Sequence, residues 1–276
     1  MPTLVDGQLT DTLPCHDRGL AYGDGLFETL ALLDGEPRHF SRHLKRLAEG
    51  ASRLGIPAPE MSRWEEDLAR LLMAGAPPPR AVLKLILTRG SGGRGYLPPE
   101  TPIPRRILQI LPWPPPSPDE DRLGIVCNTR LGINPSLAGL KHLNRLEQVL
   151  AAREVAAAGA WEGLMCDVGG QLVEGTRSNV FVVTQGRLET PRLDGAGVNG
   201  VMRAVLCERA PAWGMPIVEL HFPLERLDAA EEIFFTNSLR GIESLHRLSF
   251  DGRERRLGTR IAEALAGRLR AEGLWR

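Results

Sequence analysis

The chain has 276 residues, which is enough for one large domain or two of modest size. Hydrophobic residues make up 42% of it and charged residues 25%, as in an ordinary globular protein. Lysine plus arginine equals aspartate plus glutamate at 34 each, so no net charge favours nucleic acid or an anionic membrane as a partner. No apolar stretch reaches the roughly 18 residues of a membrane span, and the N-terminus does not resemble a signal peptide.

The first part of the chain alternates between strand and helix patterns. In chain order, we expect strands at residues 4–9 and 26–33, helices at 41–54 and 64–73, and strands at 81–89 and 106–111. Residues 112–120 then contain five prolines, which remove backbone donors and fix φ. Such a segment sustains neither helix nor sheet, so it is predicted to be a stiff linker.

The pattern restarts after this linker. We expect a strand at 123–127, a helix that Asn144 and Glu147 start as a capping box and that runs toward Gly159, strands at 163–167, 171–174 and 180–184, a helix at 201–212, a strand at 232–236 and a helix at 259–269. The fold class is therefore mixed α and β. We predict an N-terminal α/β domain over residues 1–111 and a larger C-terminal domain over residues 121–276.

The cysteines and histidines indicate no metal site. The four cysteines are far apart and form no Cys-x-x-Cys pair: Cys15, Cys127, Cys166 and Cys207. The sequence therefore predicts neither a disulfide framework nor a zinc site. Free thiols are typical of a reducing cytoplasm. His39 and His43 stand four residues apart without the glutamate of a metalloprotease helix, so we interpret them as polar helix residues.

Lys141 is hard to explain as a surface residue because apolar residues flank it on both sides. Apolar surroundings disfavour the charged form of an amine, and a neutral amine can form a Schiff base with an aldehyde. Glu174 follows in a polar loop between two strand-like runs. A lysine for the aldehyde carbon and a carboxylate for the ring nitrogen are what a pyridoxal phosphate (PLP) site requires. The alternatives are a lysine that extends to solvent from a buried stem and a solvated loop acid.

A glycine-rich segment offers a second candidate site. Residues 90–95 match the dinucleotide-binding pattern Gly-x-Gly-x-x-Gly, but the proline-rich residues after them cannot open the helix that this pattern needs. We interpret the segment as a loop that presents Arg94 and Tyr96. An arginine there can bind a carboxylate through two parallel hydrogen bonds, and the alternative is a surface turn with a solvated arginine.

Four motifs occur together in a recognisable order: residues 17–29, 43–47, the neighbourhood of Lys141, and residues 174–179. From about residue 3 to about residue 245 the chain resembles the fold-type IV PLP enzymes, which include branched-chain and D-amino-acid aminotransferases. Within that group, residues 88–96, 130–148 and 190–203 resemble the 4-amino-4-deoxychorismate lyases. The resemblance implies a smaller N-terminal α/β domain, a larger C-terminal α/β pseudo-barrel, pyridoxal 5'-phosphate as cofactor, and a homodimer with its active site at the interface.

The same resemblance implies roles for cofactor-binding residues. Lys141 matches the Schiff-base lysine, and Glu174 matches the carboxylate beneath the pyridine nitrogen. Arg46 matches the phosphate-binding arginine, although on its own it is also typical of an amphipathic helix. Val201 and Met202 match the start of a helix whose backbone N–H groups hold the phosphate. Many relatives carry threonine at the Met202 position, so this chain lacks one hydroxyl there.

The remaining implied roles concern the second phosphate loop and the substrate. Residues 236–238 (Thr-Asn-Ser) match that loop, with Asn237 the expected contact and Ser238 beside it. Thr29 matches a position where several aminotransferases carry glycine, and its hydroxyl is expected to deliver a proton to the departing product. The alternative is an ordinary strand threonine. Arg94 and Tyr96 are the expected contacts of a substrate carboxylate.

The implied activity is the conversion of 4-amino-4-deoxychorismate to 4-aminobenzoate and pyruvate, on the route to folate. The runner-up is an aminotransferase on the same scaffold, acting on D-amino or branched-chain amino acids. A third hypothesis is a non-catalytic binding protein that kept the fold. We expect a cytoplasmic protein with no nucleic-acid or membrane partner.

Overall fold

The computed structural model describes residues 2–117 and 121–275, and the chain forms two compact units. Unit 1 comprises Met1–Pro115 and Leu140–Asn144, and unit 2 comprises Pro116–Gly139 and Arg145–Arg276. Residues 140–144 were predicted to belong to the C-terminal domain, but they group with unit 1. Residues 118–120 of the predicted linker lie outside the described residues.

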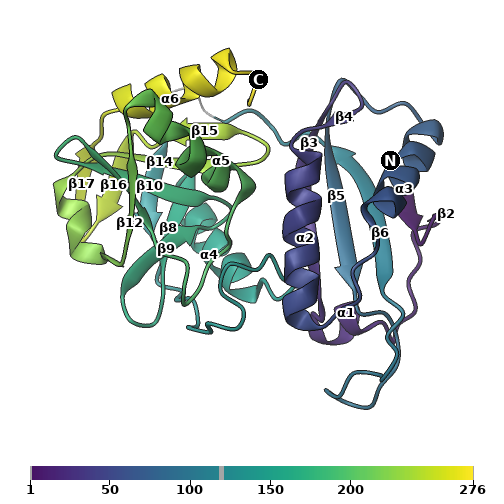
Figure 1. The fold of residues 1–276 in the computed structure, drawn as a ribbon. Helices are drawn as coiled ribbons and strands as arrows, with labels where there is room; N and C mark the ends of the chain where they lie inside the picture. The colour runs from purple at the N-terminus through teal and green to yellow at the C-terminus, as the bar shows by residue number, and fades with distance from the viewer. Residues whose placement is uncertain (1, 118–120, 276) are drawn as a thin grey trace. The chain divides into compact units, whose positions relative to one another are not determined.

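Unit 1 is built on one six-stranded sheet with strand order β2-β1-β6-β5-β3-β4 (Figure 1). The strands are β1 (Thr3–Val5), β2 (Gln8–Leu9), β3 (Gly25–Leu33), β4 (Glu36–Pro37), β5 (Arg80–Thr88) and β6 (Arg105–Pro112). The prediction of one strand over residues 4–9 is wrong, because Asp6 and Gly7 both adopt positive φ and turn the chain into a hairpin. Asp-Gly is a favoured pair for such a two-residue turn.

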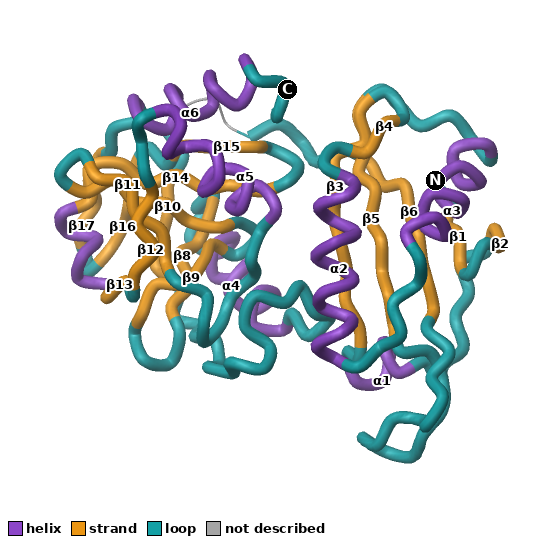
Figure 2. Tube along the Cα trace, in the orientation of Figure 1, coloured by secondary structure: helices purple, strands orange, loops and turns teal. Residues whose placement is uncertain are grey.

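Two helices, α2 (Phe40–Leu54) and α3 (Met61–Met73), lie along one face of this sheet (Figure 2). The first places Leu44, Leu47 and Ala51 in the core, as the helical spacing predicted. The second begins three residues before its predicted start. A short helix, α1 (Arg18–Tyr22), precedes β3 and is capped by the Asp17 side chain.

Unit 2 contains two sheets with orders β12-β11-β10-β14-β15 and β13-β9-β8-β7-β16-β17. Their strands are β7 (Leu123–Val126), β8 (Glu162–Cys166), β9 (Gln171–Gly175), β10 (Asn179–Thr184), β11 (Arg187–Pro191), β12 (Ile217–Leu220), β13 (Phe222–Pro223), β14 (Ala230–Asn237), β15 (Gly241–Ser244), β16 (Arg247–Phe250) and β17 (Arg253–Arg256). The helices are α4 (Leu146–Ala157), α5 (Val201–Arg209) and α6 (Arg260–Ala271), with 3-10 turns η1 (Ala210–Trp213) and η2 (Leu224–Ala229).

The side chains of β10 show how this unit is held together. Val180 and Val182 point into the core that the two sheets share. Phe181 and Val183 point the other way, toward the core formed with α5 and α6. A strand buried on both faces must be apolar along its centre, as residues 180–183 are. The two-sheet layer with outer helices agrees with the predicted mixed α and β class and the C-terminal pseudo-barrel.

The helix predicted after Asn144 exists, but the capping box does not. Asn144 donates to the carbonyl of Gly23 at 3.1 Å, and Glu147 accepts from the backbone N–H of Gly132 at 2.8 Å. These long-range partners compete successfully with the local cap, so α4 starts at Leu146. None of the helices in the described part of the chain is long and apolar enough to cross a membrane.

Candidate active site

Lys141 lies in unit 1 beside the start of β3. The backbone N–H of Phe27 donates to its carbonyl at 2.9 Å, and the N–H of Leu143 donates to the carbonyl of Gly25 at 3.0 Å. These bonds explain why residues 140–144 group with unit 1. The Lys141 side chain is half-buried, with Nζ 4.4 Å from the centre of the Phe27 ring. An ammonium over an aromatic face is attracted by the ring quadrupole.

Thr29 lies two residues after Phe27, so both side chains are on the same face of β3. Both are half-buried, whereas Glu28 between them is buried on the opposite face. The register partner of Thr29 on β5 is Lys84, whose Nζ lies 5.7 Å from the Phe27 ring centre. This face of the sheet therefore combines two amines, a hydroxyl and an aromatic ring.

Arg46 on α2 makes a two-pronged ion pair with Glu28. Its Nε and Nη2 donate to the two carboxylate oxygens at 2.8 and 2.5 Å, and His43 Nδ1 lies 2.5 Å from Oε2. Burial by itself raises the pKa of Glu28, but the charge of Arg46 and the hydrogen bonds from His43 and Arg46 outweigh it and lower that pKa to about 2. Glu28 thereby fixes the orientation of Arg46.

Glu174 lies in unit 2, at the end of β9, and is 4% exposed. One carboxylate oxygen accepts from the backbone N–H of Val198 at 2.8 Å, and the other accepts from the Gln148 side chain at 3.2 Å. Burial lowers the pKa of the nearby Arg145 guanidinium, while the negative charges of Glu174 and Glu147 oppose that effect. The Glu174 carboxylate is thus held in one orientation from two sides.

The N-terminus of α5 carries Val201 and Met202, and the preceding loop is held by Asn179. The Asn179 side chain accepts from the N–H of Gly200 at 3.1 Å and donates to the carbonyl of Val198 at 2.8 Å. A Cβ at Gly200 would lie 2.0 Å from Asn179 Oδ1, so only glycine fits this approach. The first N–H groups of a helix have no acceptor within it and favour an anion.

Asn237 and Ser238 lie at the end of β14, and the strand register sets Thr236 opposite Asn179. Asn237 Oδ1 accepts from the N–H groups of Leu239 and Arg240 at 3.0 and 2.9 Å, so it forms the turn. Thr236 is 2% exposed, and its hydroxyl has no hydrogen-bond partner within the described residues. A buried hydroxyl without a partner beside a helix N-terminus suits a phosphate oxygen.

Arg94 and Tyr96 lie on a loop of unit 1 and are both exposed. The Tyr96 ring lies against the Tyr22 ring, with centres 5.5 Å apart. The predicted site residues thus fall into two sets. Unit 1 holds Thr29, Arg46, Arg94, Tyr96 and Lys141, and unit 2 holds Glu174, Val201, Met202, Asn237 and Ser238.

Lys84 and Glu28 were not predicted as site residues, and Thr236 was predicted only as a member of the second phosphate loop. Lys84 had a visible signal, because it is the one charge inside the apolar run of residues 81–87. Glu28 and Thr236 had none beyond their place in a family motif. Their roles depend on contacts with residues far along the chain, which periodicity does not predict.

A family model described as amino-transferase class IV matches residues 25–248. The chain belongs to this family. The aminodeoxychorismate lyase of Vibrio harveyi is 34% identical over 248 residues, which cover 89% of this chain and 90% of the relative. A putative branched-chain-amino-acid aminotransferase of Methanocaldococcus jannaschii is 31% identical over 258 residues, covering 92% and 89% respectively.

Solved structures of class IV relatives share the fold. The 4-amino-4-deoxychorismate lyase from Pseudomonas aeruginosa aligns with a TM-score of 0.89 and 45% identity, covering 99% of this chain and 100% of that one. A hypothetical aminotransferase from Mycobacterium tuberculosis in its PLP-bound form aligns with a TM-score of 0.80 and 25% identity, covering 98% of each chain. This class IV chain is a PLP-dependent enzyme, which confirms the predicted family and cofactor.

The Glu28 network predicts a specific acid sensitivity. The folded pKa of about 2 lies below the ordinary 4.5, so ionised Glu28 stabilises the fold above pH 4.5 and this contribution, roughly 3 kcal/mol, is lost as pH falls toward 2. We expect Glu28→Gln to lower the free energy of unfolding at pH 7 and to flatten its decline between pH 4.5 and 2.5, measured by urea titration. Glu36→Gln, an exposed β4 residue, is the control. Parallel pH profiles for wild type and Glu28→Gln would contradict the assignment.

Proposed function

We propose that this protein is a PLP-dependent lyase that converts 4-amino-4-deoxychorismate to 4-aminobenzoate and pyruvate. The observation that carries the proposal is the β3–β5 face on which Thr29 and Lys84 pair beside Phe27 and Lys141. On this face Lys141 offers a base, Thr29 offers a hydroxyl that can deliver a second proton, and Lys84 offers a further cation. The similarity to aminodeoxychorismate lyases from two bacteria supports this reading.

The cofactor roles are proposed residue by residue. Lys141 would anchor the cofactor, and the Glu174 carboxylate would keep its ring nitrogen protonated. The N–H groups at the start of α5, which Val201 and Met202 provide, would hold its phosphate. Bound PLP supplies an electron sink for charge on the carbon next to the substrate amine.

Further phosphate contacts come from the β14 loop and from α2. Thr236 Oγ1, which has no partner within the described residues, would donate to a phosphate oxygen. Asn237 shapes the turn with its Oδ1, so its Nδ2 and the Ser238 hydroxyl are the groups proposed to bind. Arg46 adds a positive charge in the orientation that Glu28 gives it.

Two proton movements complete the reaction. When its amine is free and neutral, Lys141 removes the proton from the ring carbon that bears the substrate's amino group. The enolpyruvyl ether oxygen then leaves the adjacent carbon with the electrons of the C–O bond. Thr29 delivers a proton to the methylene carbon of the departing group, which becomes pyruvate. The six-membered ring becomes aromatic, so the reaction is downhill and needs no keto-acid partner.

The substrate is a dicarboxylate, and Lys84 and Arg94 of unit 1 are the cations proposed to bind its carboxylates. Lys84 is half-buried on the face that holds Thr29, and Arg94 is exposed on the glycine-rich loop with Tyr96. We propose that Lys84 and Arg94 each pair with one carboxylate and that Tyr96 packs beside the Arg94 contact. A homodimer in the cytoplasm is also proposed. Exposed apolar side chains at Tyr96, Leu97 and Ile103 support a partner surface near this loop.

The reaction assay separates this function from the runner-up. Purified protein loaded with PLP is incubated with 4-amino-4-deoxychorismate, and in parallel with D-amino or branched-chain amino acids plus a keto acid. We expect release of 4-aminobenzoate and pyruvate in equal amounts without any keto acid. Amino transfer without 4-aminobenzoate would assign the chain to the aminotransferases, and absence of any PLP absorbance band would favour the non-catalytic hypothesis.

Substitution of the anchor lysine tests its two roles together. Lys141→Ala is expected to lose the visible absorbance of the lysine-bound cofactor and to reduce turnover by at least about a hundredfold. Lys45→Ala serves as the matched control, because Lys45 is a lysine of α2 whose side chain is 77% exposed. Retention of both signals in Lys141→Ala would refute the assignment.

Thr29 is tested through its hydroxyl. We expect Thr29→Val, which keeps the branched shape, to reduce kcat about a hundredfold while the cofactor spectrum is unchanged. Thr29→Ser keeps the hydroxyl and should stay close to wild type. If Thr29→Val turns over as fast as the wild type, proton delivery belongs to another group.

A further inference from the structure

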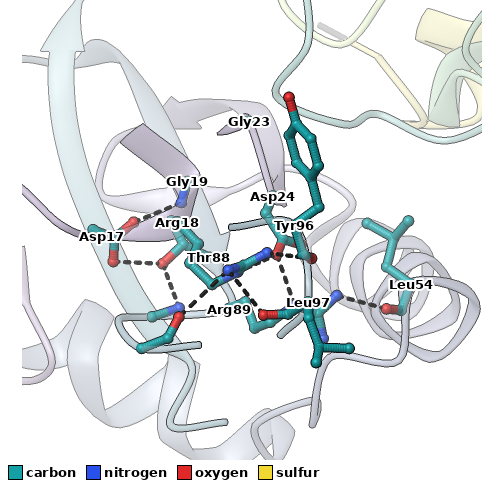
Figure 3. A network of polar contacts seen from close by, with 12 residues as sticks. Asp17, Arg18, Gly19, Gly23, Asp24, Leu54, Thr88, Arg89, Tyr96 and Leu97 are labelled. Carbon is teal, nitrogen blue, oxygen red and sulfur yellow. Dashed lines mark hydrogen bonds and ion pairs between the residues drawn. The ribbon is translucent and has the colours of Figure 1, made fainter. Parts of the chain in front are cut away.

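Arg18, at the start of α1, is 4% exposed and binds the glycine-rich loop through its guanidinium (Figure 3). Nη2 donates to the carbonyl of Tyr96 at 2.9 Å. Nη1 donates to the carbonyl of Gly95 at 3.0 Å, with longer contacts to those of Gly92 and Leu97 at 3.4 and 3.5 Å. One side chain therefore contacts the backbone at four points of residues 92–97.

Asp24 forms an ion pair with the Arg18 guanidinium. Its Oδ2 accepts from Arg18 Nε at 2.9 Å and from Arg89 Nε at 2.8 Å. Arg89 in turn donates to the carbonyls of Leu54 and Gly55 at 2.8 and 2.7 Å, at the end of α2. Burial by itself raises the pKa of Asp24, but the two guanidinium groups outweigh it and lower that pKa. The loop is thus connected through charged contacts to α2.

The base of the loop is anchored separately. The N–H of Arg18 donates to the carbonyl of Gly90 at 2.8 Å. Asp17 Oδ2 accepts from the Thr88 hydroxyl at 2.9 Å, and Asp17 forms a β-bridge with Ser91. These contacts position residues 88–91. The tip of the loop, residues 92–97, is positioned by Arg18.

Contacts with aromatic rings also restrain the tip of the loop. The Arg18 guanidinium carbon lies 4.9 Å from the centre of the Tyr22 ring, and the Tyr22 ring lies 5.5 Å from that of Tyr96. Tyr96 is itself 87% exposed, so little else restrains it. Its carbonyl bond to Arg18 and its ring contact with Tyr22 set the direction of its side chain.

Residues 92–97 have few ways to hold themselves in place. Gly93 has a φ of 79°, and a Cβ there would lie 2.4 Å from the Leu97 carbonyl oxygen, so the turn demands glycine. Glycine gives the unfolded loop many conformations and offers no side chain to pack. Besides the backbone bridge between Arg94 and Leu97, the hydrogen bonds from Arg18 therefore select the conformation that presents Arg94.

We propose that Arg18 is a positioning residue that fixes the 92–97 loop in the conformation in which Arg94 and Tyr96 receive the substrate carboxylate. The proposal rests on the substrate role of this loop given above. Arginine suits the task because its planar guanidinium carries five N–H donors in a fixed fork. A lysine has one nitrogen and cannot reach Asp24 and the carbonyls on both sides at once.

The conformation of the loop is tested by trypsin, independently of activity. Arg94 is an exposed trypsin site, and local opening limits cleavage of a held loop. We expect Arg18→Gln and Arg18→Lys holoenzymes to be cut at the Arg94–Gly95 bond about tenfold faster than wild type, as followed by fragment mass. Tyr22→Leu, which leaves the Arg18 hydrogen bonds intact, is expected to show a smaller increase.

The substrate role of the loop is tested by kinetics with 4-amino-4-deoxychorismate. We expect Arg18→Lys to raise KM about tenfold, with kcat and the cofactor spectrum nearly unchanged, because positioning affects binding more than proton transfer. In an Arg94→Ala background the same substitution should add little, since both act through one contact. The control is Arg106→Gln, which removes a comparable ion pair with Asp67 away from the loop and should alter neither readout.

Faster cleavage together with a raised KM supports the proposal. Unchanged cleavage in both Arg18 variants overturns it, and so does faster cleavage with an unchanged KM. If the wild type releases no 4-aminobenzoate, the proposed function fails, but the cleavage rates still decide whether Arg18 holds the loop. Circular dichroism and thermal unfolding of each variant distinguish these results from a loss of fold.

Discussion

The alternation of side chains along β3 is the constraint on which the chemistry of unit 1 depends. Because neighbouring residues of a strand point to opposite faces, Glu28 enters the core while Phe27 and Thr29 face the other way. The buried carboxylate orients Arg46, and the opposite face supports Lys84 and Lys141 around one aromatic ring. A shift of one residue in the register would exchange these two sets.

Two charge pairs among the described residues each determine the direction of a functional group. Glu28 holds Arg46, and Asp24 holds Arg18. Removing one partner would leave a charge without compensation in a poorly solvated place, which is costly. Glu174 follows the same logic in unit 2, where a backbone N–H and an amide side chain fix its carboxylate. Such networks orient functional groups as well as affecting the stability of the fold.

Much of the fold was predictable because it rests on local periodicity and composition. The apolar runs of β5, β6 and β10 and the helical spacing of α2 appear within short windows of sequence. The errors came where distant residues intervened. Asn144 and Glu147 have the spacing of a capping box, yet their side chains bond to Gly23 and Gly132 instead. The hairpin at Asp6 and Gly7 is the exception, because this local turn pair lies inside an otherwise strand-like pattern.

The sequence by itself determined the mixed fold class, the family and the PLP cofactor, because these follow from local patterns and from motifs in a fixed order. It also selected Lys141 as an amine among apolar neighbours. Only the tertiary structure paired Lys84 with Thr29 and joined Arg18 to the carbonyls of residues 92–97. Those contacts connect residues dozens of positions apart, and strand register and chain reversal, which no local pattern encodes, decide which of them meet.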